Sequence, residues 1–388
     1  MLMGTKMLKI KLYFLYYILF STSACFYPFI TLYFQSRNIP YYKIGFLFAI
    51  NSFVSIICQP IWGIISDRYL GKRKTIFFIM ISSAISIISF IFIKSFEMIL
   101  ISIIIFMAFQ SPIVPISDAY CYEIIDKNKA IQYGKIRLMG SMGYAVTALI
   151  LGIVIKKSSI ESTFISYTII MICTIFMLKS INFKSKQAGV PININDISKI
   201  IKNKKFILIS LAGMFASVAM GANSSYISVL IQKTGGDVSK LGLVWFVIAM
   251  SELPLFYIGN KIMKKIGILN FFIIGTTFFV IRFFINSICT SYKTVILVQL
   301  MQSITFPLYL LSTIEYVIKN SDSNMKTSAL TVFSAFTNGL GGLLGNILGG
   351  YILQLSSVFV LYKVLSLSCI ISTVVALLLK SYERIKIS

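Results

Sequence analysis

The feature that most constrains this chain is a series of long apolar runs separated by short polar loops. In a bilayer, backbone N–H and C=O groups must be paired within the protein, so an apolar run of about 20 residues crosses it as a helix. Twelve such runs can be marked, and we therefore expect an all-α membrane protein with twelve transmembrane helices. The runs cover roughly residues 12–34, 44–65, 75–93, 98–120, 136–155, 162–181, 205–231, 241–259, 267–288, 294–318, 327–353 and 357–379.

The composition excludes an ordinary soluble domain. Only 12% of the 388 residues are charged and 57% are hydrophobic, and the mean hydropathy is +0.87. A soluble protein is usually about a quarter charged. Since no soluble core could bury this much apolar surface, lipid must be part of the solvent around the chain.

The sequence also lacks the groups that most enzymes and metal sites need. It contains no histidine, the commonest general base and metal ligand. Its six cysteines lie in or beside apolar runs with no CxxC spacing, so they predict neither a zinc site nor a disulfide framework. It has no GxxxxGK[ST] loop for nucleotide phosphates. We therefore expect no enzyme activity, no metal and no cofactor.

The net charge of +24 would suggest nucleic-acid binding in a soluble protein. The distribution of the charge favours another cause. If the runs alternate across the membrane, 25 of the 36 Lys and Arg lie on the side of the termini, 8 lie in the opposite loops and 3 lie inside runs. Because basic loops stay in the cytoplasm, we expect both termini to be cytoplasmic, no nucleic-acid partner, and a place in the cytoplasmic membrane, the inner membrane of a bacterium.

The longest polar stretch predicts a division of the chain. Residues 182–204 follow the sixth run and are rich in lysine, so we expect a cytoplasmic linker between two six-helix halves, residues 1–181 and 205–388. Parallel halves are a recurrent plan among transporters. The ends of the second and eighth runs, "QPIWGIISDRYLGKRK" and "ELPLFYIGNKIMKKIG", resemble each other, as such a repeat would require.

The loop between the second and third runs carries the sharpest local motif, GxxxDR followed by a glycine and a basic cluster. The first glycine allows close helix approach, the acid and arginine can form ion pairs, and the second glycine permits a tight turn. A plain basic turn is the alternative. The motif resembles the signature loop of the major facilitator superfamily, with one extra residue before the second glycine, and this resemblance implies a conformational latch. Its residues are Gly63, Asp67, Arg68, Gly71, Lys72 and Arg73.

Two acids, Asp118 and Glu252, lie inside apolar runs rather than in loops or at run ends, and Arg137 and Arg282 are their basic counterparts. An intramembrane charge is costly and is a functional candidate by default, with a partner expected. Asp118 and Arg137 have similar predicted depths in one half, and Glu252 and Arg282 in the other. Each pair is either a structural ion pair or a site for a substrate anion or a proton.

Short strings around these residues carry a second resemblance. "PISDAY", "YGKIRLMGSMGYA", "SELP", "VIRF" and "VQLMQSITF" occur in the right runs and order. They resemble the branch of the superfamily that holds lactose-permease-like, nucleoside and phenylpropionate proton symporters, most closely the phenylpropionate-permease-like members. The resemblance implies substrate binding by Asp118 and Arg137, and proton coupling by Glu252 and Arg282.

One position departs from that branch. The tenth span commonly carries a histidine in a string like QxxHxxTF, and this chain has Gln302 there. Gln302 can hydrogen-bond Arg282 or a substrate, but its amide side chain cannot take up a proton. Coupling would then depend on Glu252 or Asp118, and an uncoupled uniporter stays open.

Aromatic and polar residues add weaker candidates for the substrate site. Tyr16, Phe20, Ser23 and Tyr27 share one face of the first run, which suits a ring-shaped solute; lipid-facing or packing aromatics are the alternative. Asn51 in the second run is a similar candidate, because a polar group there needs a partner or water.

Together these features predict a monomeric secondary transporter that takes up a small organic solute with protons by alternating access. Aromatic acids, nucleosides and oligosaccharides are the solute classes that the resemblance implies. Efflux of amphipathic compounds is the alternative within transport, beside the uniporter. A membrane solute sensor is the alternative from a different class, and the absence of a long polar loop disfavours it.

Overall fold

The computed structural model of the chain describes residues 2–127, 133–181, 183, 203–321 and 326–385. Every regular element among these residues is a helix. The elements are α1 (Leu2–Phe26), α2 (Ile30–Ser36), α3 (Tyr41–Ile65), η1 (Ser66–Leu70), α4 (Lys72–Ser86), α5 (Ser89–Phe92), α6 (Phe96–Gln110), α7 (Ile113–Lys127), α8 (Tyr133–Lys157), α9 (Ser162–Lys179), α11 (Lys204–Lys233), α12 (Val238–Ile266), α13 (Ile268–Ile288), α14 (Tyr292–Gln299), η2 (Leu300–Ile304), α15 (Phe306–Lys319), α16 (Lys326–Ser334), η3 (Ala335–Gly341), α17 (Gly342–Leu355) and α18 (Val358–Ile385).

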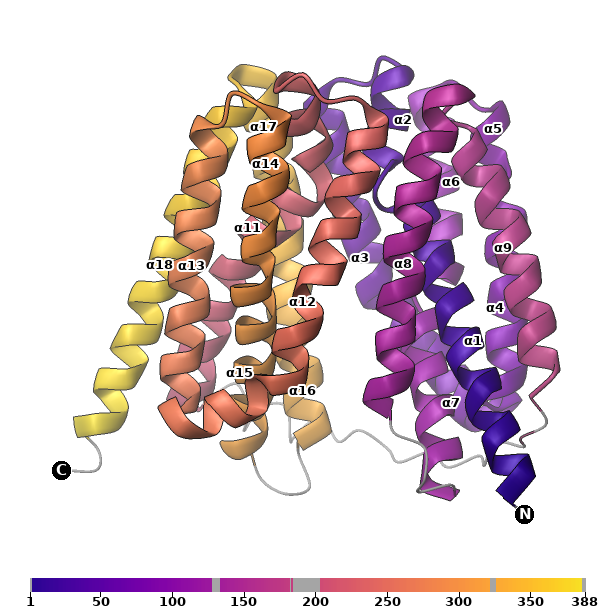
Figure 1. Cartoon of the computed structure of the whole chain (residues 1–388), viewed down its shortest axis with the longest axis horizontal. Coiled ribbons are helices and arrows are strands. Elements are labelled where there is room, and N and C mark those ends of the chain that lie inside the picture. The colour runs from indigo at the N-terminus through magenta and orange to yellow at the C-terminus, as the bar shows by residue number, and fades with distance from the viewer. Residues whose placement is uncertain (1, 128–132, 182, 184–202, 322–325, 386–388) are drawn as a thin grey trace. The chain divides into compact units, whose positions relative to one another are not determined.

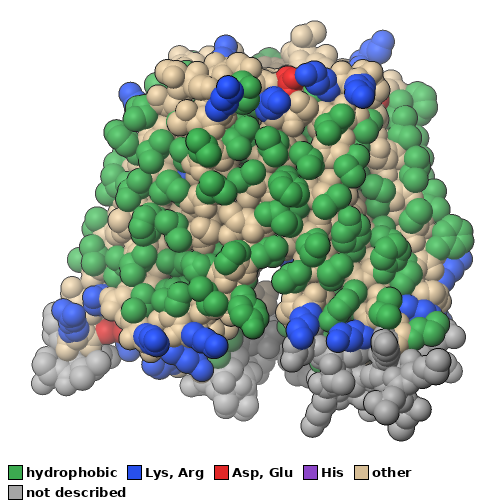
Figure 2. All heavy atoms as spheres, viewed as in Figure 1, with side chains coloured by type: hydrophobic (Ala, Val, Ile, Leu, Met, Phe, Trp, Pro, Cys, Tyr) green, Lys and Arg blue, Asp and Glu red, His purple; other side chains and the backbone are tan. Residues whose placement is uncertain are grey.

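Eleven helical stretches of the described residues are long and apolar enough to cross a membrane. They coincide with eleven of the twelve predicted runs, which confirms the all-α membrane fold. The remaining run, 327–353, falls on α16, η3 and α17, which follow one another without a break. Its many glycines lower its mean hydropathy. Figure 2 shows hydrophobic side chains over the middle of the helices and Lys and Arg at their ends, as lipid contact requires.

The chain forms two compact units, and α3 and α12 each contribute to both. The first unit comprises Met1–Ile39, Phe53–Val190 and Asp237–Met250, and the second comprises Pro40–Ser52, Pro191–Gly236 and Ser251–Ser388. The predicted linker 182–204 lies almost entirely outside the described residues. The predicted division into two sequence halves, 1–181 and 205–388, stays a prediction.

In the first unit, α1 packs along α8 and α9 (Figure 1). Two glycines of α8 lie against α1. A Cβ atom at Gly143 would meet the backbone of Tyr17, and one at Gly140 would meet the ring of Phe20. Since no larger residue fits between these helices, glycine permits their close approach. This contact places the Phe20 ring beside the first turns of α8.

In the second unit, α11 packs against α17 and α18 (Figure 1). A stripe of Gly341, Gly345 and Gly349 faces α11, where added Cβ atoms would meet Met214, Val218 and Tyr226. These glycines therefore permit the close approach of the two helices.

The tenth predicted span is not one continuous α-helix. It consists of α14, the 3-10 helix η2 and α15. Proline at position 307 lacks an N–H and disfavours an α-helical hydrogen bond to the preceding turn. A 3-10 stretch inside a helix often marks a functional position, and here it contains Gln302.

The predicted internal repeat has a counterpart in the backbone. Gly71 precedes α4 with φ 76° and ψ 149°, and Gly267 precedes α13 with φ 90° and ψ 151°. Both conformations lie in the region that favours glycine. The helices before these turns each contain a proline, Pro60 in α3 and Pro254 in α12. The two turns are thus locally equivalent.

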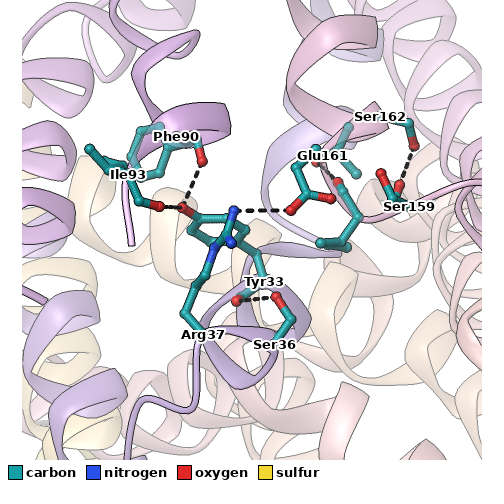
Figure 3. Close-up of polar contacts among 10 residues, drawn as sticks. Tyr33, Ser36, Arg37, Phe90, Ile93, Ser159, Glu161 and Ser162 are labelled. Atoms are coloured by element: carbon teal, nitrogen blue, oxygen red, sulfur yellow. Dashed lines mark hydrogen bonds and ion pairs between the residues drawn. The ribbon is translucent and has the colours of Figure 1, made fainter. Parts of the chain in front are cut away.

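A polar cluster of the first unit ties α2 to two neighbouring segments (Figure 3). The Tyr33 hydroxyl donates to the carbonyl of Phe90 at 2.7 Å. Arg37 lies over the Tyr33 ring and forms an ion pair of 3.0 Å with Glu161, in the loop before α9. Both charged side chains are mostly buried, so the pair fixes the ends of these helices relative to one another.

Candidate functional site

The first unit gathers five predicted or neighbouring residues into what we call the Asp118 cluster: Tyr16, Phe20, Asp118, Tyr133 and Arg137. The Tyr16 hydroxyl donates to a carboxylate oxygen of Asp118 at 2.7 Å. Tyr133 is a second hydrogen-bond partner of this carboxylate. Hydroxyl donors to a carboxylate are strong hydrogen bonds, so the two tyrosines hold Asp118 in one place on α7.

Arg137, one turn into α8, lies close enough to Asp118 for its charge to act on it. Its guanidinium carbon lies 4.0 Å from the centre of the Phe20 ring, in the geometry of a cation–π contact. Arg137 forms no hydrogen bond or ion pair with the residues that the structure describes. The N–H groups of the guanidinium are therefore available to an acceptor from outside the chain.

The first run's aromatic face is only partly used here. Tyr16 and Phe20 belong to the cluster, whereas Tyr27 follows the end of α1. Eleven residues along a helix span about 16 Å, so Tyr27 lies far from the contact between Tyr16 and Asp118. Asn51 lies in the part of α3 that belongs to the second unit. The assignment of both residues to the substrate site stays a prediction.

The second unit contains the other predicted pair, in what we call the Arg282 cluster: Glu252, Arg282, Gln299 and Gln302. Arg282 is 1% exposed. Its Nη1 donates to Oε1 of Gln302, and Nε2 of Gln302 donates to Oε1 of Glu252 at 2.6 Å. One neutral amide therefore joins the buried arginine to the acid, with its oxygen toward the cation and its nitrogen toward the carboxylate.

Sequence reasoning missed one member of this cluster. Gln299, fully buried at the end of α14, accepts a hydrogen bond from Nη2 of Arg282 and donates to the carbonyl of Val295 at 2.8 Å. It stands in the string "VQLMQSITF", one helical turn before Gln302. In the sequence it is one glutamine in an apolar run, which does not distinguish it from other polar residues there. Sequence reasoning also missed Tyr133, which lies four residues before Arg137.

The predicted latch loop forms different ion pairs from those expected. Lys72 contacts Asp67 at 3.0 Å and Glu123, on α7, at 2.6 Å. The sequence suggested that Asp67 pairs with Arg68, but Arg68 is exposed and forms no ion pair within the described chain. The π-helical turn η1 and the bend at Gly71 place Lys72 between the two acids.

Other residues of this loop differ in how they pack. Nη2 of Arg73 donates to the carbonyl of Lys179 at 2.9 Å, which ties α4 to the end of α9. Gly71 has the positive φ that its predicted turn needs. A Cβ atom at Gly63 would meet no described atom within 4 Å, so the close helix approach expected there is not formed. The latch role of the loop stays a prediction.

A further ion pair of the first unit joins α8 to the start of α12. Nζ of Lys156 lies 2.6 Å from Oδ2 of Asp237. Ser239 also donates to Asp237, at 2.5 Å. The hydrogen bonds from Lys156 and Ser239 hold the pKa of the Asp237 carboxyl below its usual range. Nearby, Cβ atoms at Gly152 and Gly242 would each meet the other helix, so α8 and α12 touch closely here.

The two clusters differ in the groups that they offer. The Asp118 cluster offers a fixed carboxylate, aromatic rings and a guanidinium. The Arg282 cluster offers an acid whose charge is balanced by arginine through an amide. Among the described residues, no group of three or more cysteine, aspartate or glutamate side chains could hold a metal ion.

Comparison with known proteins agrees with this geometry. The sequence profile of the MFS_1 like family, a major facilitator family, matches residues 9–364. The chain is 27% identical over 350 residues to YwbF, an uncharacterized transporter of Bacillus subtilis (strain 168), covering 89% of this chain and 86% of that one. It is 22% identical to the maltose permease of Geobacillus stearothermophilus, over 95% and 94% of the two chains.

The predicted branch also has counterparts among similar proteins. A probable 3-phenylpropionic acid transporter of Escherichia coli (strain K12) is 21% identical over 264 residues, covering 64% of this chain and 66% of that one. The crystal structure of the nucleoside transporter NupG superposes with a TM-score of 0.85, at 15% identity, over 96% of this chain and 98% of that one. The predicted resemblance to this superfamily is confirmed.

Proposed function

The chain belongs to the MFS_1 like family and is a multi-pass secondary transporter rather than an enzyme, and we propose that it takes up a small organic solute together with protons. The observation that carries the proposal is the chain of contacts from Glu252 through Gln302 to the fully buried Arg282. A charged network inside a transmembrane bundle is costly, so its presence there indicates a function. Glu252 is its proton-accepting group.

Solute binding belongs to the Asp118 cluster in this proposal. Arg137 presents N–H groups to the acceptor atoms of a solute, and Asp118, fixed by Tyr16 and Tyr133, accepts from its donors. The rings around Arg137 favour a solute with a flat or apolar face. These features suit aromatic acids and nucleosides, and also sugars with several hydroxyl groups. The maltose, 3-phenylpropionic acid and nucleoside transporters named among similar proteins supply the first compounds to try.

Coupling follows from the state of Glu252. When the carboxylate is charged, Arg282 balances it through Gln302. When it takes a proton, the balance changes, and the loaded carrier can reorient around its central site, as inverted and parallel-repeat transporters do. Loss of the proton on the other side then favours release. Asp118 is the alternative proton carrier, since it is the acid of the other cluster.

The orientation in the membrane is part of the proposal. The excess of Lys and Arg in the loops on the side of the termini supports cytoplasmic termini. Solute and protons then enter from the side of the loop between α8 and α9. A monomer suffices for this mechanism, because both clusters come from one chain.

The test is uptake by purified protein in proteoliposomes with an imposed inward proton gradient. Radiolabelled 3-phenylpropionate, uridine, maltose and sucrose are offered in turn, with and without a protonophore. The proposal predicts accumulation of one solute above its outside concentration, and loss of that accumulation with the protonophore.

Two other outcomes would overturn the proposal. Equilibration of one solute without accumulation would indicate a uniporter, the reading that Gln302 in place of a histidine favours. Expulsion of a preloaded amphipathic dye in exchange for entering protons would indicate efflux. Uptake by Glu252→Gln equal to that of the unmodified chain would remove Glu252 from the coupling.

A further inference from the structure

Two polar side chains near the Arg282 cluster have buried atoms that the described chain leaves without hydrogen bonds. Asn286 is fully buried on α13, and neither its Nδ2 nor its Oδ1 has a partner. The Nε–H of Arg282 is likewise buried and unpartnered. A buried polar group without a partner is costly, and such groups are few in native structures.

The three atoms belong to one region of the second unit. Asn286 follows Arg282 by four residues, and residues four apart lie on the same face of a helix with Cβ atoms about 6 Å apart. Nε is the guanidinium nitrogen nearest to the main chain of α13. The other two nitrogens already have partners, because Nη1 donates to Gln302 and Nη2 donates to Gln299. The donor that remains is therefore Nε–H, on the same helix as Asn286.

The chemistry of these atoms selects the ligand. Nε–H and Nδ2 are donors, whereas Oδ1 is an acceptor. A metal cation would be repelled by Arg282. A halide would accept from both donors but would leave Oδ1 without a donor. Water donates and accepts at once, and buried waters typically make about three hydrogen bonds to otherwise unpaired groups.

We propose that Asn286 and the Nε–H of Arg282 bind an internal water molecule, which makes Asn286 a positioning residue for Arg282. With this water, all three nitrogens of the guanidinium are hydrogen-bonded, by Gln302, by Gln299 and by water. The polar network that begins at Glu252 then extends one helical turn further, toward the Ile288 end of α13. The role in coupling rests on the proposed function, whereas the water site itself does not.

The site is tested first by a high-resolution crystal structure of the full chain grown in bromide. We expect an ordered water about 2.7–3.2 Å from the Asn286 amide and from Nε of Arg282, with no anomalous signal. An anomalous peak there would replace the water with an anion. A protein group that satisfies Asn286 instead would also overturn the proposal.

The role is tested by Asn286→Leu, which has a similar size and removes both amide atoms. Using whichever of 3-phenylpropionate, uridine, maltose and sucrose the chain takes up, we expect about a 10-fold loss of proton-driven accumulation. Solute exchange at equal concentrations on both sides should stay within about two-fold. Ser287→Ala is the matched control, because the neighbouring Ser287 is also buried but donates to the carbonyl of Phe284.

Asn286→Ser keeps the result interpretable if Asn286→Leu does not fold. Its shorter hydroxyl side chain leaves room for water, and we expect accumulation near that of the unmodified chain. Equal loss of accumulation and exchange in Asn286→Ser would assign Asn286 a merely structural role. Unchanged accumulation in Asn286→Leu would overturn the positioning role. If the unmodified chain shows no proton-driven accumulation, the proposed function fails, and the crystal structure still decides the water site.

Discussion

In the Asp118 cluster two tyrosine hydroxyls hold the carboxylate and Arg137 lies on an aromatic ring, whereas in the Arg282 cluster one glutamine joins the carboxylate to the arginine. Both clusters combine an acid and an arginine inside a membrane-spanning unit. They differ in how these charges are satisfied. Among the described residues, the first leaves the guanidinium without an ion-pair partner, and the second links the arginine to the acid through Gln302.

The difference indicates what each arrangement is suited to do. An arginine without an ion-pair partner can bind a solute without first breaking an internal bond. An arginine tied to an acid through an amide responds to the charge of that acid. Sequence depth alone predicted two similar pairs, and only the packing separates a binding arrangement from a coupling arrangement.

The largest effect is expected for Glu252→Gln, which tests the coupling role of the Arg282 cluster. An amide cannot carry a proton, so we expect proton-driven accumulation to fall at least about 100-fold while solute exchange continues. The two are compared in the same proteoliposomes. Asp118→Asn is the matched change in the other cluster and should reduce both activities together. Accumulation that survives in Glu252→Gln but not in Asp118→Asn would reverse the two roles.

The next largest effect is expected for Arg137→Ala. Loss of a charged hydrogen bond costs about 1.5–3 kcal/mol, so solute binding should weaken about 10- to 100-fold. Equilibrium binding of the transported solute to detergent-solubilised protein measures this. Arg68→Ala is the control, because Arg68 is an exposed arginine of the same unit. An unchanged affinity in Arg137→Ala would leave the residue a packing role on Phe20.

Tyr16→Phe tests how the Asp118 carboxylate is held in the first unit. It removes one of the two hydroxyl donors to Asp118, which frees the carboxylate to approach Arg137 and compete with the solute. We expect about a 10-fold weaker binding of the solute. Tyr33→Phe removes a buried hydroxyl that donates only to backbone carbonyls, so it should lower thermal stability and leave affinity unchanged. Equal affinity in both variants would contradict the role of Tyr16.

Gln299→Leu tests the second unit by stability. It leaves Nη2 of Arg282 buried without an acceptor, at a cost of about 1–3 kcal/mol, and should lower Tm by several degrees. Gln110→Leu is the matched change, because Gln110 is a buried glutamine of the first unit that accepts from the Tyr167 hydroxyl. Its partner is neutral, so the loss should be smaller. A larger loss for Gln110→Leu would contradict the view that Gln299 supports a buried charge.

The smallest effect concerns the ion pair between Lys156 and Asp237. Since hydrogen bonds lower the pKa of Asp237, its contribution is present above the unfolded value of about 3.9 and is lost only as the pH falls through the lower folded value. Asp237→Asn keeps a helix-capping side chain and removes the charge. We expect a Tm difference of at most about 2 °C from the unmodified chain, equal at pH 5 and pH 7.5. A difference that vanishes at pH 5 would show that the carboxyl has taken a proton there.

Much of the fold could be predicted from sequence, because it depends on local properties. Apolar length located eleven spans, and glycine identified the turn at Gly71. These features need only a residue and its near neighbours. The expected close approach at Gly63 failed for the same reason, since a glycine permits a contact without providing the other helix.

The partners within the site could be predicted only in part. Lys72 and Glu123 are 51 residues apart, and Tyr16 and Asp118 are 102 residues apart. Their meeting depends on how each helix is rotated and how deep it lies, which a span boundary does not fix. Gln302 was placed by resemblance, whereas Gln299 and Tyr133 were missed because nothing in a single sequence distinguishes them from other polar residues in apolar runs.

The most direct test of the central claim is internal pH during solute entry. Proteoliposomes containing a pH-sensitive dye are mixed with 3-phenylpropionate, uridine, maltose or sucrose, without an imposed gradient. Our account predicts internal acidification with one solute in the unmodified chain, and entry of labelled solute without acidification in Glu252→Gln. Entry without acidification in the unmodified chain would contradict it, because the Arg282 cluster would then move no proton.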